Sequence, residues 1–142
     1  MKPVSELLRN RPVALWHVKP EDTVFDALKV LAEREAGALM VMDKGKLVGV
    51  LSERDYTRKV ALQGKNSKET RVGDIMTREV MVVSPKTRTK ECMALMTQRK
   101  IRHLPVVEGG TVVGMISILD IMADIIADHE VTISQLQSYI YA

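Results

Sequence analysis

The fold is decided by the stretch Gly49-Val50-Leu51-Ser52-Glu53-Arg54-Asp55 and by a second stretch of the same pattern, Gly114-Met115-Ile116-Ser117-Ile118-Leu119-Asp120. In each stretch an apolar run ends at a serine, and an aspartate follows three residues later. The two stretches lie 65 residues apart, and the same offset aligns Val18-Lys19-Pro20 with Val83-Ser84-Pro85. The chain therefore contains an internal repeat, which has to be recognised before any single element is assigned.

The first copy of the repeat predicts a helix followed by a hairpin and a second helix. The helix is indicated by apolar residues at i, i+3, i+4 and i+7, namely Val24, Ala27, Leu28 and Leu31. Two apolar runs at 38–42 and 47–51, separated by turn residues, predict the hairpin. The second helix is expected from Glu53 to about Leu62.

The second copy predicts the same order of elements. Its first helix carries Thr89, Cys92, Met93 and Met96 at the matching positions, and its hairpin is expected over 104–116. Another helix is expected from Ile118 onward. Asp22 and Thr87 are the predicted N-caps of the two first helices.

These elements predict an α+β fold made of two β-α-β-β-α repeats. A unit of about 50 residues cannot cover both faces of its own sheet. We therefore expect the two repeats to pack sheet to sheet about a pseudo-twofold axis. The predicted organisation is a first repeat over 1–66, a second over 67–128 and a C-terminal helical extension over 129–142. The repeats begin with short lead-ins at 4–8 and 72–76.

Composition narrows the class of protein. The 142 residues are 46% hydrophobic and 27% charged, which is ordinary for a globular chain. The sequence contains no apolar run near the ~18 residues of a membrane span and no apolar secretory leader at its start. The single cysteine, Cys92, excludes an internal disulfide or a multi-cysteine zinc site, and three scattered histidines lack metal-ligand spacing. We expect a cytoplasmic protein that binds neither metal nor membrane.

Charge is distributed unevenly along the chain. All 21 Lys and Arg residues lie at or before Arg102, together with 13 of the 18 acidic residues. The five remaining acids fall in the last forty residues. A basic body with an acidic end could attract an anion or a second copy of the chain, or could simply be a solvated surface.

The repeated Ser-x-x-Asp admits two interpretations. A serine at a helix start favours a phosphate or ribose oxygen, and a carboxylate one turn later can accept two hydrogen bonds from a ribose diol. Alternatively, the serine and aspartate form a capping box that satisfies the amides of their own helix. Because the pattern occurs twice in the same register, we favour a nucleotide-binding role.

Over about 4–126, the sequence resembles a tandem pair of CBS domains, the arrangement called a Bateman module. The resemblance rests on the two Gly-x-x-Ser-x-x-Asp stretches and on Arg102-His103-Leu104-Pro105-Val106-Val107. The segment 51–56 is similar to small stand-alone bacterial and archaeal CBS-pair proteins. The resemblance implies a cleft for AMP, ADP, ATP or NAD, with S-adenosylmethionine less favoured. In such modules the aspartate holds the ribose hydroxyls.

Two pockets follow from this resemblance. One would combine Ser52, Arg54 and Asp55 with residues before the other repeat's hairpin: Ile101, Arg102, His103 and Pro105. The other would combine Ser117 and Asp120 with Ala36, Gly37 and Ala38. Arginine pairs well with phosphate, so the pocket with Arg54 and Arg102 is the preferred phosphate site. The second pocket departs from the family pattern by having Leu119 before its aspartate.

We therefore expect a regulatory ligand-sensing module rather than an enzyme. The sequence shows no nucleophile beside a base and no paired catalytic carboxylates, so neither catalysis nor a catalytic cofactor is expected. The alternative is a nucleic-acid-associated regulator that uses the basic segment 54–71. Acidic residues interrupt that segment and no helix-turn-helix pattern frames it, so nucleic acid is disfavoured.

The last segment predicts a partner surface. Apolar residues recur in alternating steps of three and four, with His129 as the one polar member: Leu119, Met122, Ile126, His129, Ile133, Leu136 and Ile140. The first half of this stripe could instead cover the chain's own sheet, and Val131-Thr132-Ile133 could interrupt the helix. We expect a homodimer formed partly through this helix, and an unidentified regulated protein as a further partner.

Overall fold

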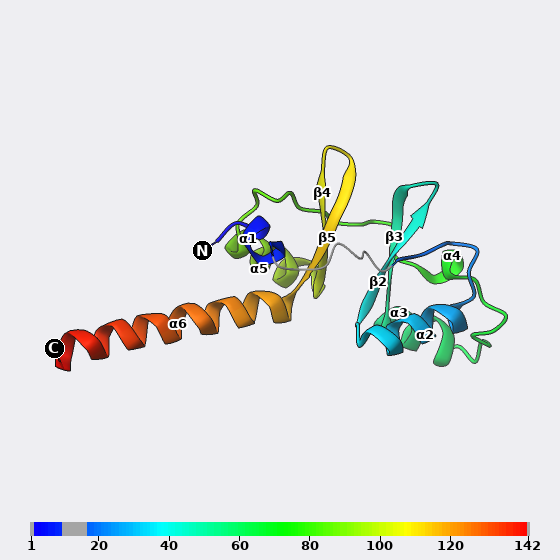
Figure 1. The fold of residues 1–142 in the computed structure, drawn as a ribbon. Helices are drawn as coiled ribbons and strands as arrows, with labels where there is room; N and C mark the ends of the chain where they lie inside the picture. Colours follow the sequence, from blue (N-terminus) through cyan, green and yellow to red (C-terminus); the bar gives the residue numbers. More distant parts are fainter. Residues whose placement is uncertain (1, 10–16, 142) are drawn as a thin grey trace. The chain divides into compact units, whose positions relative to one another are not determined.

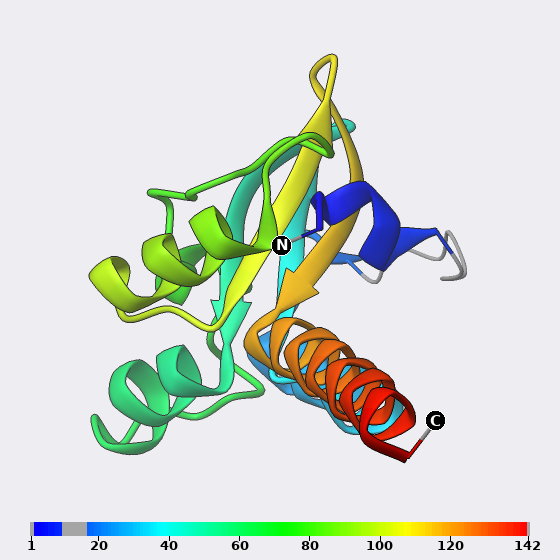
Figure 2. The same ribbon diagram turned by 90° about the vertical axis from the view of Figure 1, so that its left-hand side faces the viewer.

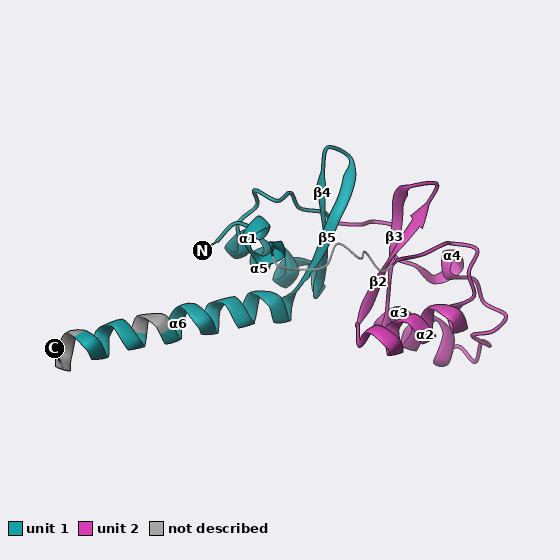
Figure 3. Cartoon of the chain, viewed as in Figure 1, with its two compact units in different colours: residues 1–13, 82–142 teal, residues 14–81 magenta. Residues whose placement is uncertain are grey.

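The computed structural model describes residues 2–9 and 17–141. They form two compact units: unit 1 contains residues 1–13 and 82–142, and unit 2 contains residues 14–81 (Figure 3). The predicted mixture of helix and strand is confirmed (Figure 1). The units differ from the sequence division at residue 66 because each lead-in joins the other repeat. Residues 4–8 belong with the second repeat, and residues 72–76 belong with the first.

Unit 2 is built around a three-stranded sheet. The strands, in spatial order, are β1 (His17–Val18), β2 (Ala38–Asp43) and β3 (Lys46–Ser52). β1 is parallel to β2, and β2 and β3 form an antiparallel hairpin in which Ala38 lies opposite Ser52. The turn residues Lys44 and Gly45 have φ values of 50° and 80°, which suits a type I′ hairpin turn. The predicted hairpin is confirmed.

The helices of unit 2 share one apolar core with this sheet. They are α2 (Val24–Arg34), α3 (Glu53–Tyr56), a π-helical turn (Thr57–Ala61) that continues α3, and α4 (Val72–Ile75). On α2 the residues at the predicted spacing, Val24, Ala27 and Leu31, are at most 4% exposed. They belong to one cluster with buried residues of β2, β3 and α4. Burial of this stripe explains why α2 is stable in its place.

Unit 1 repeats the arrangement with a weaker first strand. Its elements are α1 (Val4–Leu8), α5 (Thr89–Arg99), β4 (His103–Glu108), β5 (Thr111–Ser117) and α6 (Ile118–Tyr141). β4 and β5 form the predicted hairpin, with His103 opposite Ser117. In place of β1 there is one parallel bridge, in which the Val83 N–H donates to the Pro105 carbonyl at 3.0 Å. The lead-in α1 joins the unit through Val4, whose N–H donates to the Thr87 carbonyl at 2.8 Å.

The two predicted N-caps are wrong by one residue or more. Helix α2 is capped by Thr23, whose side chain accepts from the Asp26 N–H, and α5 begins after Arg88 without a side-chain cap. Asp22 instead accepts from the Lys19 N–H at 2.9 Å. Thr87, its counterpart in the repeat, accepts from the Ser84 N–H at 3.1 Å. Both side chains therefore hold the turn that precedes the helix, a common use of short polar residues.

Helix α6 is one unbroken element in both views of the chain (Figures 1 and 2). It crosses residues 131–133 without a break, so the interruption considered there does not occur. β-Branched residues lower helix propensity only slightly, and two well-formed turns on either side maintain the helix. Across residues 2–9 and 17–141, no helix combines the length and hydropathy that crossing a bilayer requires.

Candidate functional site

The two Ser-x-x-Asp stretches form the same local structure. We call Ser52–Asp55 the first turn and Ser117–Asp120 the second turn. In the first turn Ser52 donates from its N–H and its hydroxyl to Asp55 Oδ2, at 3.0 and 3.1 Å, and the Asp55 N–H donates back to Ser52 Oγ at 3.1 Å. In the second turn the corresponding distances are 2.7, 3.0 and 3.3 Å. Each pair thus forms the capping box that the sequence allowed as an alternative.

Asp55 has further partners within unit 2. Its Oδ1 lies 3.0 Å from Lys59 Nζ and accepts from the Thr77 hydroxyl at 3.2 Å. The same Lys59 ammonium donates to the Ile75 carbonyl at 2.8 Å. Asp55 is only 7% exposed, so this carboxylate is enclosed by groups that donate to it. Lys59 and Thr77 were not singled out from the sequence, although Lys59 follows Asp55 by the four residues of a helical ion pair.

The second turn has a different electrostatic environment. The residue four positions after Asp120 is Asp124, the repeat counterpart of Lys59. Asp124 faces the lead-in and lies 2.9 Å from Lys2 Nζ, which is also 3.6 Å from Asp128. The hydrogen bond from Lys2 to Asp124 raises the pKa of the Lys2 ammonium. The lead-in of each unit is thus held by a lysine, but the lysine lies on the π-helical turn in unit 2 and on the lead-in in unit 1.

Each turn is also fastened to the segment that enters its own hairpin. The Glu53 N–H donates to the Gly37 carbonyl at 3.1 Å, and the Ile118 N–H donates to the Arg102 carbonyl at 2.9 Å. The structure therefore brings Ala36, Gly37 and Ala38 to the first turn, and Ile101, Arg102 and His103 to the second. Pro105 lies farther along β4 and is buried. The pockets that the resemblance implies combine residues of both units, and they stay predictions.

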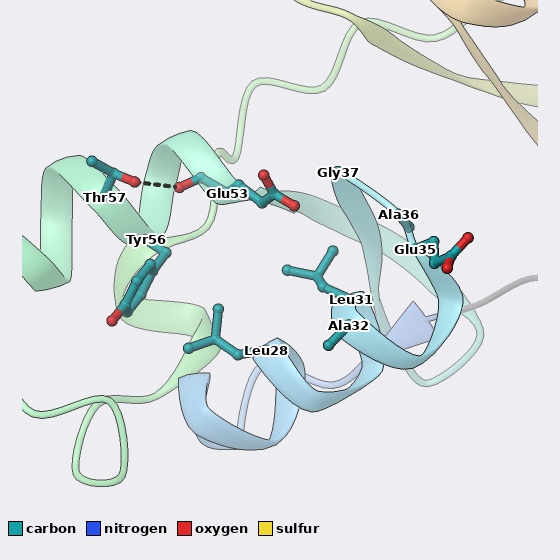
Figure 4. Close-up of a pocket in the computed structure, with 9 residues that line it drawn as sticks. All are labelled: Leu28, Leu31, Ala32, Glu35, Ala36, Gly37, Glu53, Tyr56 and Thr57. Carbon is teal, nitrogen blue, oxygen red and sulfur yellow. Dashed lines mark hydrogen bonds between the residues drawn. The ribbon is translucent and has the colours of Figure 1, made fainter.

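A cavity of about 540 Å³ lies in unit 2 beside the first turn (Figure 4). Leu28, Leu31 and Tyr56 face this space, and Ala36 and Gly37 border it. Its volume falls within the range of small-molecule sites. Leu28 and Tyr56 were not predicted as lining residues, because their spacing indicates core packing equally well. Ala36 and Gly37 were predicted site residues, and their small side chains leave room beside the end of α2.

The described residues offer no group of three or more His, Cys, Asp or Glu side chains that could hold a metal ion. Cys92 is buried on α5, and desolvation raises the pKa of its thiol. A protonated, inaccessible thiol is a poor nucleophile and a poor ligand. What the arrangement offers chemically is hydrogen bonding and charge: two serine hydroxyls, two carboxylates and the exposed guanidinium groups of Arg54 and Arg102.

Comparisons with known proteins point to one family. The family model of the CBS domain matches residues 4–62 and 72–127. The mitochondrial CBS domain-containing protein CBSX3 of Arabidopsis thaliana is 42% identical over 131 residues, which cover 89% of this chain and 63% of that protein. The chain thus spans less than two thirds of the length of this relative.

Solved structures agree with this. A CBS-domain protein of Burkholderia ambifaria MC40-6, described as a candidate signal-transduction protein, is 46% identical, with a TM-score of 0.87 over 89% of this chain and 96% of that one. The hexameric CBS-CP12 protein from bloom-forming cyanobacteria is 30% identical, with a TM-score of 0.76 over 85% of this chain and 70% of that one.

Proposed function

Because the chain belongs to the CBS-domain family and carries two CBS domains, we propose that it is a regulatory module that senses adenosine nucleotides. AMP, ADP, ATP and NAD are the proposed ligands, with S-adenosylmethionine less favoured. The ligand would bind in the cleft between the two repeats and alter how the chain docks on a partner. Such a switch requires a nucleotide to bind one arrangement more tightly than another.

The observation that carries this proposal is the paired turn. Both turns place a serine hydroxyl and a carboxylate at the point where a strand passes into a helix. That combination suits the ribose of a nucleotide, since a carboxylate can accept from both hydroxyls of a cis-diol. Arg54 and Arg102 are exposed, and they are the proposed contacts for phosphate oxygens.

The proposed base contacts are the hairpin-entry segments. Ala36, Gly37 and Ala38 serve one pocket, and Ile101, His103 and Pro105 serve the other. The cavity beside Ala36 and Gly37 supports the first of these assignments, because an apolar space lined by Leu28 and Tyr56 suits a flat base. The regulated protein at the end of this signal is not identified by any feature of the described residues.

Thermal unfolding tests the proposal. AMP, ADP, ATP, NAD and S-adenosylmethionine are added separately, with GTP as a control for phosphate and ribose binding. At a hundred times its dissociation constant, a ligand adds about 2.7 kcal/mol to the stability of the native state. We expect at least one adenosine nucleotide to raise the melting temperature and GTP to raise it less. No shift with any of them, together with no heat of binding in calorimetry, would contradict the proposal.

The nucleic-acid alternative receives less support from the structure. Within the basic segment 54–71, Lys59 is engaged with Asp55 and the Ile75 carbonyl. Arg71 donates to the Glu21 carbonyl at 2.8 Å, and Lys68 lies over the Phe25 ring at 4.9 Å. A DNA-binding surface needs several lysines and arginines that reach phosphates together. These cations are instead directed to separate groups of their own unit.

We further propose that a second copy of the chain covers the apolar stripe of α6. Its described members are strongly exposed, with 71% exposure at Leu119, 55% at Ile126 and Ile133, and 58% at Leu136. The opposite face packs on unit 1, since Ile121 is fully buried and Asp124 is 7% exposed. In heptad terms the stripe occupies positions a and d, and the aspartates lie at b, c and f. Only Glu130 lies at a flanking position, so like charges do not oppose self-association.

The dimer is tested by light scattering after size exclusion. Replacing Ile133 and Leu136 by serine should halve the mass, because both side chains are exposed in the single chain and their loss does not disturb its core. Gln135→Ala with Ser138→Ala changes the far face of the same helix and should leave the mass at twice 15.9 kDa. A double serine variant that stays dimeric would contradict this surface. The hexameric CBS-CP12 protein shows that a chain with CBS domains can form a higher assembly.

We propose no catalytic step. The relatives are named for their CBS domains or for signal transduction, which agrees with a sensor. A cytoplasmic location stays a prediction, and the mitochondrial Arabidopsis relative makes it a question for experiment.

A further inference from the structure

The two turns differ in how far their carboxylates are already used. A carboxylate offers about four lone-pair sites for hydrogen bonds. At Asp55 these are matched by four donors: the Ser52 N–H and hydroxyl at Oδ2, and Lys59 and Thr77 at Oδ1. A ribose diol needs two of these sites. To reach Asp55 it would have to displace the Lys59 ammonium and the Thr77 hydroxyl from a carboxylate that is 7% exposed.

The second turn lacks this closure because its chemistry is inverted. Asp124 stands where the first repeat has Lys59, and an aspartate cannot neutralise Asp120 or donate to it as an ammonium does. Its carboxylate is directed to Lys2, with 2.9 Å between Oδ1 and Nζ. Asp120 is half-buried, whereas Asp55 is buried. The charge reversal at one position of the repeat therefore separates two otherwise matching turns.

Resting on the proposed function, we propose that Lys59 closes the first turn to a ribose, so that the second turn is the one that takes the nucleotide. This is the opposite of the order that the distribution of arginines suggests. Lys59 is then a specificity-determining residue: it makes Asp55 a structural clamp between α3 and the segment after α4, and leaves Asp120 as the sugar contact.

Calorimetry on the full chain tests the assignment with AMP and with 2′-deoxy-AMP. The wild-type chain should bind about one AMP, and loss of the 2′-hydroxyl should weaken binding about tenfold or more, since a hydrogen bond to a charged group is at stake. Asp120→Asn should weaken AMP binding at least about tenfold more than Asp55→Asn does, and should remove most of the difference between the two ligands. Asp43→Asn, the same charge change at a hairpin tip, should have no effect.

A second variant approaches the question from the other side. Lys59→Met keeps the apolar stem but removes the ammonium, and it should add a second AMP site at the first turn. Lys65→Met, an exposed lysine in the following linker, should leave the stoichiometry at one.

The inference is overturned if Asp55→Asn weakens AMP binding more than Asp120→Asn, if two equal sites are present in the wild-type chain, or if Lys59→Met adds no site. Each of these leaves nucleotide sensing intact. An absence of binding to the wild-type chain by AMP and by every other adenosine ligand would instead remove the proposed function, and this inference with it.

Discussion

Replacing Gly49 by alanine should destabilise unit 2, whereas the same change at its repeat counterpart Gly114 should be nearly tolerated. Both glycines lie opposite a hairpin partner at the point where a lead-in crosses the sheet. A methyl group at Gly49 would lie 2.7 Å from Met76 Sδ and 2.9 Å from the Thr77 carbonyl oxygen. At Gly114 it would lie 3.0 Å from the two terminal methyls of Leu8.

The difference follows from what has to move. The Thr77 backbone exchanges two hydrogen bonds with Val50, at 3.0 and 2.9 Å, so a shift of its carbonyl breaks good geometry. Overpacking of this kind costs about 1–3 kcal/mol. Alanine recovers about 0.4–1 kcal/mol by restricting the unfolded chain. We expect Gly49→Ala to lose about 1–2 kcal/mol of unfolding free energy and Gly114→Ala to stay within about 1 kcal/mol of wild type, because Leu8 can rotate.

Urea unfolding followed by circular dichroism measures both variants. At an unchanged slope, the loss appears as a lower midpoint for Gly49→Ala alone. Hydrogen exchange locates it, since the amides of Val50 and Thr77 should exchange faster in that variant. Equal midpoints for the two variants, or a larger effect at Gly114, would show that the contact between Gly49 and the Thr77 backbone does not constrain the sheet.

Other changes should report on particular groups. Thr89 Oγ1 is buried without a hydrogen-bond partner, and the repeat counterpart is the fully buried Val24; Thr89→Val should therefore raise the unfolding free energy by about 1 kcal/mol, and Val24→Thr should lower it, in urea melts. The raised pKa of Lys2 means that its contribution to stability is present below its ordinary pKa of 10.5 and is lost as the pH rises through the higher folded value. The melting-temperature difference between wild type and Lys2→Met should therefore be steady up to about pH 10 and shrink above it; a difference that grows there would be contradictory. Cys92, whose pKa burial raises, should react with a thiol reagent at pH 7.5 only as fast as the unit opens, which fast stoichiometric labelling of the native chain would disprove.

Local patterns predicted most of the elements. The spacing of Val24, Ala27 and Leu31 gave the buried face of α2, and the turn residues after Met42 gave the hairpin. These predictions succeed because periodicity and turn chemistry act over a few residues. The caps failed at the same range: Asp22 and Thr87 are good capping residues, but each is used by the preceding turn, and two such uses cannot be separated by residue type alone.

The amino-acid sequence by itself determined the duplication, the α+β class and the two serine–aspartate turns, because each is written in short runs and in one repeated offset. Only the tertiary structure decided that each lead-in packs with the other repeat and that Lys59 encloses Asp55 while Asp124 turns to Lys2. Those outcomes depend on which distant segment offers a donor at about 3 Å, and the free energy of that choice is shared between residues that are far apart in the chain.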